Sequence, residues 1–422
     1  MPRGFYLLIA GQAISSLADN ALLIVAVALL QERGSPLWWA PLLKFAFTLS
    51  YVLLAPAIGP LADAMPKARL MTAMNLVKLT GIALLMAGIN PLAAFAVVGF
   101  GAASYAPAKY GLVTEMVGPR KLVAANGWIE VSVVCAALLG TVTGGLLVAD
   151  VLRDSSLSTA LSQCLAPWAD SSLLLSMAVL LAAYLLAAVM NAAVPDSGAR
   201  YAPVRLHVRV LVREFRAASR TLWRDRDGGL SLAVTSIFWG VGATLQFAVL
   251  KWATELLGLT LERAAYLQAA VALGVIAGAG LAGRHVALGR AKRVLPAGVV
   301  LGLCMPLVAS TESLWLAVPL LALVGAVGGV LVVPLNALLQ HRGYTLLSAG
   351  RSIAVQGFNE NLNVLAMLAG YAALIALDVP IVPLMWGFGL LVAGAIALLI
   401  RREHVMERRL GPSPDSQFTS LR

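Results

Sequence analysis

The sequence predicts an all-α membrane protein whose twelve transmembrane helices form two pseudo-symmetric six-helix bundles. Three observations lead to this fold class. The chain of 422 residues is 60% hydrophobic and only 12% charged, whereas soluble proteins are about half apolar and about a quarter charged. Apolar stretches of membrane-spanning length recur along the chain. The second half also repeats sequence features of the first.

Twelve stretches are long and apolar enough to cross about 30 Å of hydrocarbon, which takes roughly 20 helical residues. The first is too long, and too polar at Asp19 and Asn20, to be a cleaved signal peptide. The expected spans lie near 5–30, 38–63, 69–89, 91–115, 122–149, 171–194, 231–254, 264–284, 293–310, 313–340, 349–376 and 380–400.

Basic residues concentrate in alternate loops between these spans. The chain carries 31 Lys and Arg against 20 Asp and Glu. Loops rich in Lys and Arg stay in the cytoplasm, so the pattern predicts that both termini are cytoplasmic. Because membrane topology accounts for the positive charge, we expect no nucleic-acid partner.

The most basic segment joins spans six and seven. Arg200, Arg209, Arg213 and further arginines alternate there with Leu, Val and Phe. This pattern predicts a basic amphipathic helix on the inner leaflet, in contact with membrane lipids. We therefore expect an N-terminal six-helix bundle over 1–194, a basic cytoplasmic linker over 195–230, a C-terminal six-helix bundle over 231–400 and a cytoplasmic tail over 401–422.

The repeat appears when the two halves are aligned so that Leu122–Val131 lies opposite Leu346–Val355. The same alignment brings Asp19 of the first span near Thr244 of the seventh. Two parallel six-span halves, related by an axis normal to the membrane, are typical of major facilitator transporters, which hold their substrate between the halves.

The loop after the second span carries a more specific signal. Gly59–Arg69 resembles the Gly-x-Leu-Ala-Asp signature of the major facilitator superfamily, with Pro66 in place of the usual central glycine. The resemblance implies a gate in which Asp63 caps or pairs at a helix end, while Lys67 and Arg69 meet anionic lipid. The alternative is a turn that only connects two helices.

A set of further strings is spread over nearly the whole chain: Ala18–Leu23, Asn75 with Lys78, Pro107–Gly111, Ala125–Gly127 with Glu130, Phe238–Gly240, Val333–Gln340, and Ala354–Gln356 with Glu360 and Asn361. Together these strings resemble the bacterial lysophospholipid transporter family. The resemblance implies a flippase that moves lysophosphatidylethanolamine and lysophosphatidylglycerol from the outer to the inner leaflet of the bacterial inner membrane. A separate acyltransferase on the cytoplasmic face would then restore the missing chain.

Polar side chains inside spans are the candidates for substrate binding. An ionisable side chain at the bilayer centre costs about 2.5–3.5 kcal/mol on insertion scales, so it faces a cavity or a partner. Asp19 would receive an ammonium head group or carry a proton, or else fix helix packing. Lys109 would bind phosphate, or else reach the interface or pair with Glu115. The resemblance implies that arginine is usual at the position of Gln246, and the glutamine here weakens the prediction of a cation site on span seven.

The remaining candidates are weaker, because single amides and a lone tryptophan in a span are also common packing residues. The predicted substrate-binding residues are Asp19, Asn20, Lys109, Gln246, Trp239, Asn336, Gln340 and Glu360. The predicted gating residues are Asp63, Lys67, Arg69, Lys78, Glu115, Glu130 and Arg351. Glu130 and Glu360 would form the inner gate or couple to a cation, or else pair with Lys78 or Arg351 as a structural bridge.

Two other functions were weighed against lysophospholipid transport. A proton-coupled exporter of drugs or small metabolites would use the same fold. A membrane-bound acyltransferase is disfavoured, because none of the four histidines has an aspartate five positions later. We expect no enzymatic activity, no cofactor and no metal.

Overall fold

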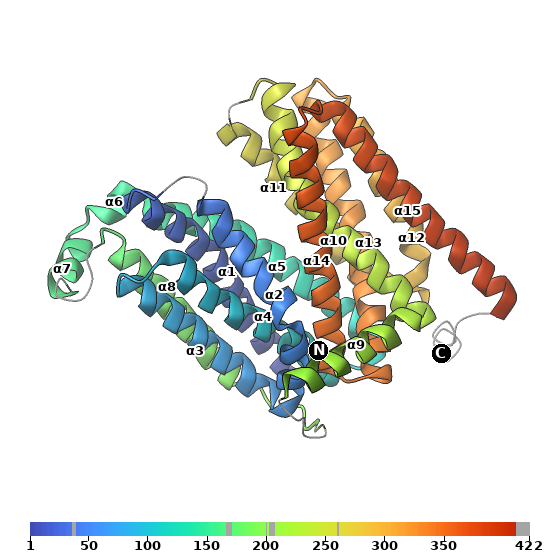
Figure 1. The fold of residues 1–422 in the computed structure, drawn as a ribbon, viewed down its shortest axis with the longest axis horizontal. Helices are drawn as coiled ribbons and strands as arrows, with labels where there is room; N and C mark the ends of the chain where they lie inside the picture. The colour runs from blue at the N-terminus through green and yellow to red at the C-terminus, as the bar shows by residue number, and fades with distance from the viewer. Residues whose placement is uncertain (36–38, 166–170, 200, 202–206, 260, 411–422) are drawn as a thin grey trace. The chain divides into compact units, whose positions relative to one another are not determined.

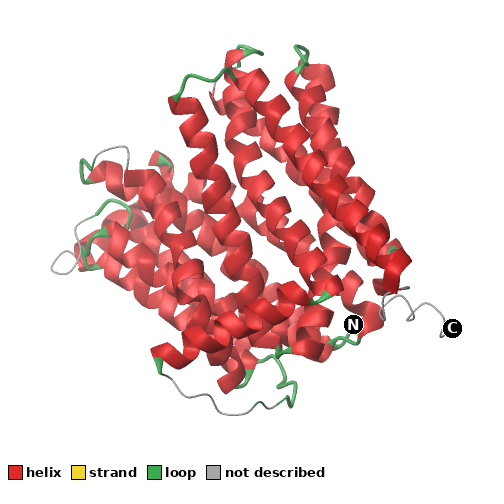
Figure 2. Ribbon diagram, turned by 45° about the vertical axis from the view of Figure 1, so that its right-hand side comes forward, coloured by secondary structure: helices red, strands yellow, loops and turns green. Residues whose placement is uncertain are grey.

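The computed structural model describes the whole chain except residues 36–38, 166–170, 200, 202–206, 260 and 411–422. Throughout the described residues the regular structure is helical (Figure 2). In chain order the helices are α1 Arg3–Glu32, α2 Trp39–Ala64, α3 Lys67–Met86, α4 Pro91–Met116, α5 Pro119–Val148, α6 Asp150–Arg153, α7 Ser156–Leu165, α8 Leu174–Ala192, α9 Val208–Arg224, α10 Arg226–Glu255, α11 Leu261–His285, the 3₁₀ helix η1 Leu288–Val294, α12 Leu295–Ala309, α13 Leu314–Leu346, α14 Ala349–Ala376 and α15 Ile381–Leu410 (Figure 1).

These helices confirm the predicted fold class. Among the described residues, eleven helices are long and apolar enough to cross a membrane. The twelfth predicted span is α14, which has 28 residues but carries Asn359, Glu360, Asn361 and Asn363 near its middle. These polar side chains lower its hydropathy. The chain is therefore a multi-pass membrane protein of twelve spanning helices.

Two helices run further than the sequence predicted. α13 continues to Leu346 and α15 to Leu410, beyond the expected ends at 340 and 400. Charged residues such as Arg401 and Arg402 mark where the apolar stretch stops, but they are good helix formers and do not end a helix. The hydropathy pattern therefore marked the end of each apolar span and not the end of the helix.

Prolines and glycines set several helix ends. α4 and α5 start on Pro91 and Pro119, because the ring of proline fixes φ at a helical value at the first position. Gly34 and Gly88, with φ of 64° and 79°, follow the ends of α1 and α3. A helix often ends on a residue in this left-handed conformation, which glycine adopts without a steric penalty.

The chain divides into two compact units. Unit 1 consists of Met1–Met116, Cys135–Ala217 and Ser348–Gly357, and unit 2 of Val117–Val134, Ala218–Leu347 and Phe358–Arg422. Each unit thus contains the first turns of one long helix whose remainder belongs to the other unit. Unit 2 holds the start of α5, and unit 1 holds the start of α14.

Within unit 1, α3 packs between α4 and α8, while α1 lies against α8 and α2 against α4. The core between them is apolar, and Leu22, Leu85, Phe95 and Met177 are almost completely buried in it. Lipid is as apolar as these side chains, so close packing rather than escape from water holds such helices together. A row of polar side chains in this interior therefore needs a separate explanation.

Within unit 2, α11 and α13 form the most intimate helix pair, and α12 packs against α15. A Cβ atom on Gly274 of α11 would lie 2.0 Å from the carbonyl oxygen of Ala322, and one on Gly325 of α13 would lie 2.0 Å from that of Val271. Only glycine allows backbones to approach this closely. Gly274 and Gly325 therefore serve the close packing of α11 against α13.

Candidate functional site

A row of polar residues on one face of α1 begins the strongest candidate site. Gln12, Ser15 and Asp19 recur at spacings of three and four residues, which aligns them along one side of a helix. Gln12 and Ser15 are completely buried in the structure. The charge of Asp19 marked it as a candidate in the sequence, whereas the uncharged Gln12 and Ser15 were not predicted as site residues.

Asp19 forms an ion pair with Lys78 of α3, at 2.8 Å between Oδ2 and Nζ. Tyr184 of α8 donates a hydrogen bond to the other carboxylate oxygen at 2.6 Å. The side chain of Lys78 is 2% exposed and that of Asp19 is 17% exposed. The carboxylate is thus the accessible part of a pair whose cation is enclosed.

Further contacts hold the ammonium group of Lys78 in place. It donates a second hydrogen bond to Ser15 at 3.0 Å. It also lies 5.3 Å and 5.5 Å from the ring centres of Tyr105 and Tyr184, within the range of a cation–π attraction. Breaking a buried ion pair by removing one partner typically costs 3–5 kcal/mol, because the other charge is left uncompensated. The cluster is therefore a fixed feature of unit 1.

Amides extend the polar cluster away from the ion pair. Ser15 donates to the Oδ1 atom of Asn75 at 2.8 Å, and Asn191 donates to the hydroxyl group of Tyr105 at 3.2 Å. The Nδ2 atom of Asn75 is buried and has no hydrogen-bond partner among the described residues. A buried donor of this kind marks a place where a ligand oxygen or a water molecule would be stabilised.

Lys109 of α4 supplies a second buried cation to this interior. It is 8% exposed, and its Nζ donates to the side-chain oxygen of Gln12 at 3.3 Å. The Nζ atom also lies 4.3 Å from the ring centre of Tyr110. Lys109 therefore lies on the same side of α1 as Ser15 and Asp19. Its contact residue Gln12 is about one turn before Ser15 and two turns before Asp19.

We refer to Asp19, Lys78, Tyr184, Ser15, Asn75, Tyr105, Asn191, Gln12 and Lys109 as the polar cluster of unit 1. Asn20, which follows Asp19, is not part of it, since its amide donates to the backbone oxygen of Ser16 on its own helix. The missed members, such as Tyr184, Tyr105 and Gln12, carry no charge that would mark them in an apolar stretch. The spacing of Gln12, Ser15 and Asp19 was the one available signal.

A second charged cluster in unit 1 surrounds the start of α14. Asp63, near the end of α2, accepts a hydrogen bond from the hydroxyl group of Ser348 and one from the backbone N–H of Gly350 at 3.0 Å. A carboxylate at this position offsets the partial positive charge of the helix N-terminus and satisfies one of its free N–H groups. Arg351 in the same turn pairs with Glu214 of α9 at 2.9 Å.

We call the contacts that hold the first turns of α14 or of α5 the seat of that helix. Lys67 connects the seat of α14 to α4. Its ammonium group lies 2.6 Å from Glu115 and 3.7 Å from Asp63. Glu115 also accepts hydrogen bonds of 2.6 Å from Ser197 and from Tyr201. Glu115 is thus occupied by Lys67 and two hydroxyl groups, and Lys78 by Asp19. These are not the pairs of Lys109 with Glu115 and of Lys78 with Glu130 that the sequence analysis had considered.

The remaining predicted gating residues are Arg69 and Glu130. Arg69 is exposed on α3. Glu130 belongs to the part of α5 that lies in unit 2, where it is 4% exposed. The neighbouring Asn126 exchanges two hydrogen bonds of 2.9 Å with Gln340 of α13. The amides of Asn126 and Gln340 thus join the first turns of α5 to α13 in unit 2, whereas a carboxylate contacts the first turn of α14 in unit 1.

Five of the predicted substrate-binding residues lie in unit 2, on three helices. They are Trp239 and Gln246 on α10, Asn336 and Gln340 on α13, and Glu360 on α14. Gln246 is exposed, and its backbone oxygen accepts a hydrogen bond from Gln268. Trp239 is half-buried and stacks edge-to-face on Phe238. Asn336 is buried, and Glu360 is partly exposed.

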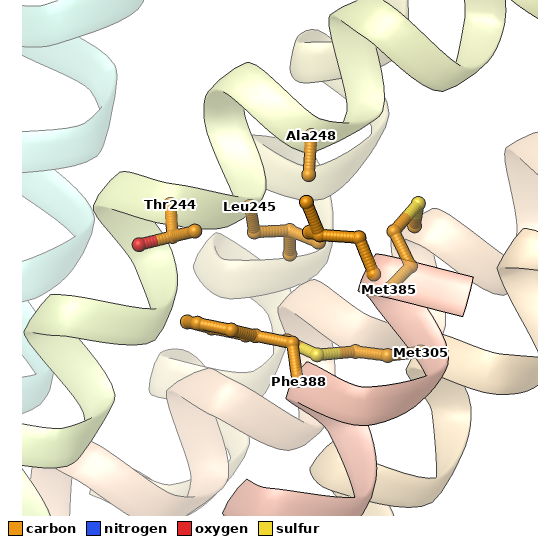
Figure 3. Close-up of a pocket in the computed structure, with 7 residues that line it drawn as sticks. Thr244, Leu245, Ala248, Met305, Met385 and Phe388 are labelled. Carbon is orange, nitrogen blue, oxygen red and sulfur yellow. The ribbon is translucent and has the colours of Figure 1, made fainter. Parts of the chain in front are cut away.

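Unit 2 also contains a small apolar pocket where α10 faces α12 and α15. Side chains of Thr244, Leu245 and Ala248 point from α10 toward Met305 and Phe388 (Figure 3). The hydroxyl group of Thr244 donates to the carbonyl oxygen of Gly240 on its own helix. The pocket therefore presents hydrocarbon and sulfur, and no charge, to whatever enters it.

Comparisons with known proteins agree with this architecture. The model of the Major Facilitator Superfamily matches residues 8–358. Among solved structures, the outward conformation of the transporter FucP has a TM-score of 0.72 at 17% identity, covering 94% of this chain and 98% of that one. The human organic anion transporter MFSD10 (TETRAN) has a TM-score of 0.69 at 18% identity, covering 96% of this chain and 100% of that one.

Sequence relatives are much closer than these structures. A protein of Citrobacter koseri named lysophospholipid transporter LplT is 40% identical over 398 residues, which cover 94% of this chain and 95% of that protein. The protein of the same name from Yersinia enterocolitica is 39% identical and covers 90% of each chain. The chain therefore belongs to the major facilitator superfamily and, within it, to the family of bacterial proteins named lysophospholipid transporter LplT.

Proposed function

We propose that this protein is a carrier, not an enzyme, that moves lysophospholipids from the outer to the inner leaflet of the bacterial inner membrane. The observation that carries the proposal is the 40% identity over 94% of the chain with a protein named lysophospholipid transporter. The polar cluster of unit 1 supports it with suitable chemistry. Lysophosphatidylethanolamine and lysophosphatidylglycerol are the proposed substrates.

A lysophospholipid makes a limited demand on its carrier. Its single acyl chain is stable in hydrocarbon, whereas moving its charged head group through hydrocarbon has a large free-energy cost. The protein has to shelter the head group and can leave the tail in the surrounding lipid, through a lateral opening between helices. A compact polar cluster within an apolar helix bundle meets this demand.

Lysophosphatidylethanolamine carries an ammonium group and a phosphate group, the same two charges as Lys78 and Asp19. We infer that the lipid binds by exchanging partners with this pair. Its ammonium group would take the exposed side of the Asp19 carboxylate, while its phosphate would take the ammonium group of Lys78, 2.8 Å from Asp19 in the empty pair. Every charge stays compensated during the exchange, so the cost of an isolated buried charge is avoided.

Lysophosphatidylglycerol has a phosphate but no ammonium group, and it requires a different balance. Asp19, Lys78 and Lys109 together give the polar cluster one more positive than negative charge. Lys109 can bind the phosphate while Lys78 stays with Asp19. The free Nδ2 of Asn75 offers a further hydrogen bond to a phosphate or glycerol oxygen.

The second charged cluster suits a gate. Transporters of this superfamily expose their site to the two sides of the membrane in turn. We infer that Asp63, Lys67 and Glu115 form a latch that holds the start of α14 in one state and releases it in the other, with Arg351 joining through Glu214. Arg69, exposed beside the latch, would meet anionic lipid, and Glu130 would act in the second half.

The proposal also includes an orientation of the protein in the membrane and an enzyme that acts after it. The latch and both termini would lie on the cytoplasmic side, as the positive-inside rule predicts for the basic loops. A separate acyltransferase on that side would restore the missing chain of each delivered lipid.

Uptake of radiolabelled lysolipids into spheroplasts tests the substrate site. Asp19→Asn and Lys78→Gln should each abolish uptake of lysophosphatidylethanolamine, and Lys109→Gln should abolish uptake of lysophosphatidylglycerol. Thr80→Val is the matched control, because Thr80 also lies on α3 and its hydroxyl group donates to the backbone oxygen of Val77 on the same helix. Normal uptake by Asp19→Asn, at an unchanged protein level in the membrane, would remove Asp19 from the mechanism. Collapse of uptake by a protonophore would instead indicate coupling to protons.

A further inference from the structure

The helix α9, Val208–Arg224, carries a feature that lysophospholipid transport does not use. Five of its arginines are spaced by four, three, four and four residues. At 3.6 residues per turn this spacing confines them to a sector of about 80° on the helix surface. We call this set the arginine stripe; its members are Arg209, Arg213, Arg216, Arg220 and Arg224, and all five are exposed.

The opposite face of α9 is the one that packs onto the protein. Leu211, Ala218 and Leu222 are buried, and they lie on the side of the helix facing away from the arginine stripe. The acidic residue Glu214 lies on a flank and pairs with Arg351. The orientation of α9 is therefore fixed, and it turns the arginine stripe outward.

The arginine stripe has no counter-charge of its own. Within the part of the chain that the structure describes, none of the five guanidinium groups forms an ion pair or a hydrogen bond. Like charges at neighbouring positions on a helix face repel each other and destabilise the helix. Anions gathered around the five guanidinium groups would relieve this repulsion.

The connection to α10 places this row at the level of lipid head groups. α9 ends at Arg224, and the spanning helix α10 begins at Arg226. Beside the stripe, Val208 and Trp223 are exposed, at 74% and 43%. Arginine next to exposed apolar and tryptophan side chains is typical of helices that lie at a membrane surface.

We propose that the arginine stripe binds the phosphate groups of anionic phospholipids in the same membrane. A guanidinium group matches two oxygens of a phosphate at once, and the stripe contains arginine at every basic position. Attraction to an anionic membrane surface strengthens binding roughly fivefold for each nearby basic residue. Zwitterionic lipids offer no net charge, so the stripe selects for phosphatidylglycerol-type head groups.

This binding would bear on the latch. Through Glu214, α9 holds Arg351 in the first turn of α14, and the same turn is held by Asp63 at Gly350. Anionic lipids that fix α9 therefore support one seat of α14. Transport would then depend on the anionic fraction of the membrane, whichever lysolipid is carried.

Spin-labelled lipids test the proposal without a transport measurement. Full-length protein is reconstituted in phosphatidylcholine vesicles, and the fraction of immobilised spin-labelled phosphatidylglycerol is compared with that of spin-labelled phosphatidylcholine. We expect a severalfold preference for phosphatidylglycerol in the wild type. The variant with Arg→Gln at all five stripe positions should show a ratio close to one, and raising the salt concentration should weaken the wild-type preference.

Two further variants make the result specific. Arg→Lys at the five positions keeps the charge and should retain part of the preference, because the bidentate geometry is lost. Arg→Gln at Arg401, Arg402, Arg408 and Arg409, exposed near the end of α15, lowers the net charge elsewhere and should leave most of the preference.

A stripe variant that elutes as folded protein and keeps the wild-type ratio would overturn the proposal and leave an acidic protein as the stripe's partner. An equal loss in the α15 variant would also overturn it, because net charge alone would then be responsible. Failure of lysolipid uptake would leave this result unchanged.

Discussion

The two units place opposite chemistry at comparable points of the repeat. In unit 1, Asp19 lies in an ion pair with Lys78. In unit 2, the matching stretch around Thr244 lines an apolar pocket with Met305 and Phe388 (Figure 3). This point of the repeat therefore holds an ion pair in unit 1 and apolar side chains in unit 2. A charge survives inside such a bundle only with its compensating partner.

The helices α5 and α14 each begin in one unit and continue in the other. Their seats differ in the same way. A carboxylate of unit 1, that of Asp63, holds the start of α14. The start of α5 in unit 2 is held by the amide pair of Asn126 and Gln340. Close approach is shared: a Cβ on Gly59 would lie 3.0 Å from the Cα of Arg351, and Gly283 approaches Gly127 in the equivalent way. The backbone contacts are symmetric, whereas the polar contacts are not.

The largest effect is expected when the ion pair between Asp19 and Lys78 in unit 1 is broken. Lys78→Met leaves Asp19 without a counter-charge and should lower the free energy of unfolding by about 3–5 kcal/mol. Thermal unfolding in detergent would show this loss. In the double variant with Asp19→Asn, stability should largely return while uptake of lysophosphatidylethanolamine stays absent. If both single variants were as stable as the wild type, the pair would contribute nothing to the fold.

The next effect compares the two helix seats. Asp63→Ala removes a charged acceptor at the start of α14, worth about 1.5–3 kcal/mol for hydrogen bonds to a charged group. Asn126→Ala removes one neutral partner in unit 2, and leaving Gln340 unsatisfied costs about 1–3 kcal/mol. Thermal unfolding of the two variants in parallel would rank the seats. A larger loss for Asn126→Ala would reverse the comparison.

A smaller effect is expected in the apolar pocket. Thr244→Val keeps the shape of the side chain and removes a hydroxyl group that bonds only to its own helix. The change in stability should stay within about 1 kcal/mol, and uptake should be unchanged. Ser15→Ala in unit 1 should cost more, because Ser15 contacts both Lys78 and Asn75. Equal costs would mean that the two interiors do not differ in energy.

The smallest expected effect is a dependence on pH outside the spans. Burial raises the pKa of Asp225, but hydrogen bonds from Arg342 and from the backbone N–H of Gly228 outweigh it and hold the pKa below its ordinary value. The carboxylate thus stabilises the folded state at neutral pH, and this contribution is lost as the pH falls below about 4. Thermal unfolding between pH 7 and pH 3 should show the loss in the wild type. Asp225→Asn should be less stable at pH 7 and less sensitive to acid.

Hydropathy was enough to predict the twelve spans and the all-α fold, because crossing lipid requires long apolar helices whose backbone groups are satisfied internally. The acidic residue Asp19 was also identifiable, since a charge in a span is rare. Its partner was not: Lys78 lies 59 residues away on α3, and the sequence suggested Glu130 for it. Tyr184 and Gln12 were missed because uncharged residues in apolar stretches are common.

By itself, the sequence determined which segments cross the membrane, the repeat that relates the two halves, and the chemical types available inside each half. Only the tertiary structure decided which of these residues meet. It paired Asp19 with Lys78, Lys67 with Glu115 and Asp63 with the start of α14. The physical reason is that apolarity is a local property of a segment, whereas compensation of a buried charge depends on which helix faces it.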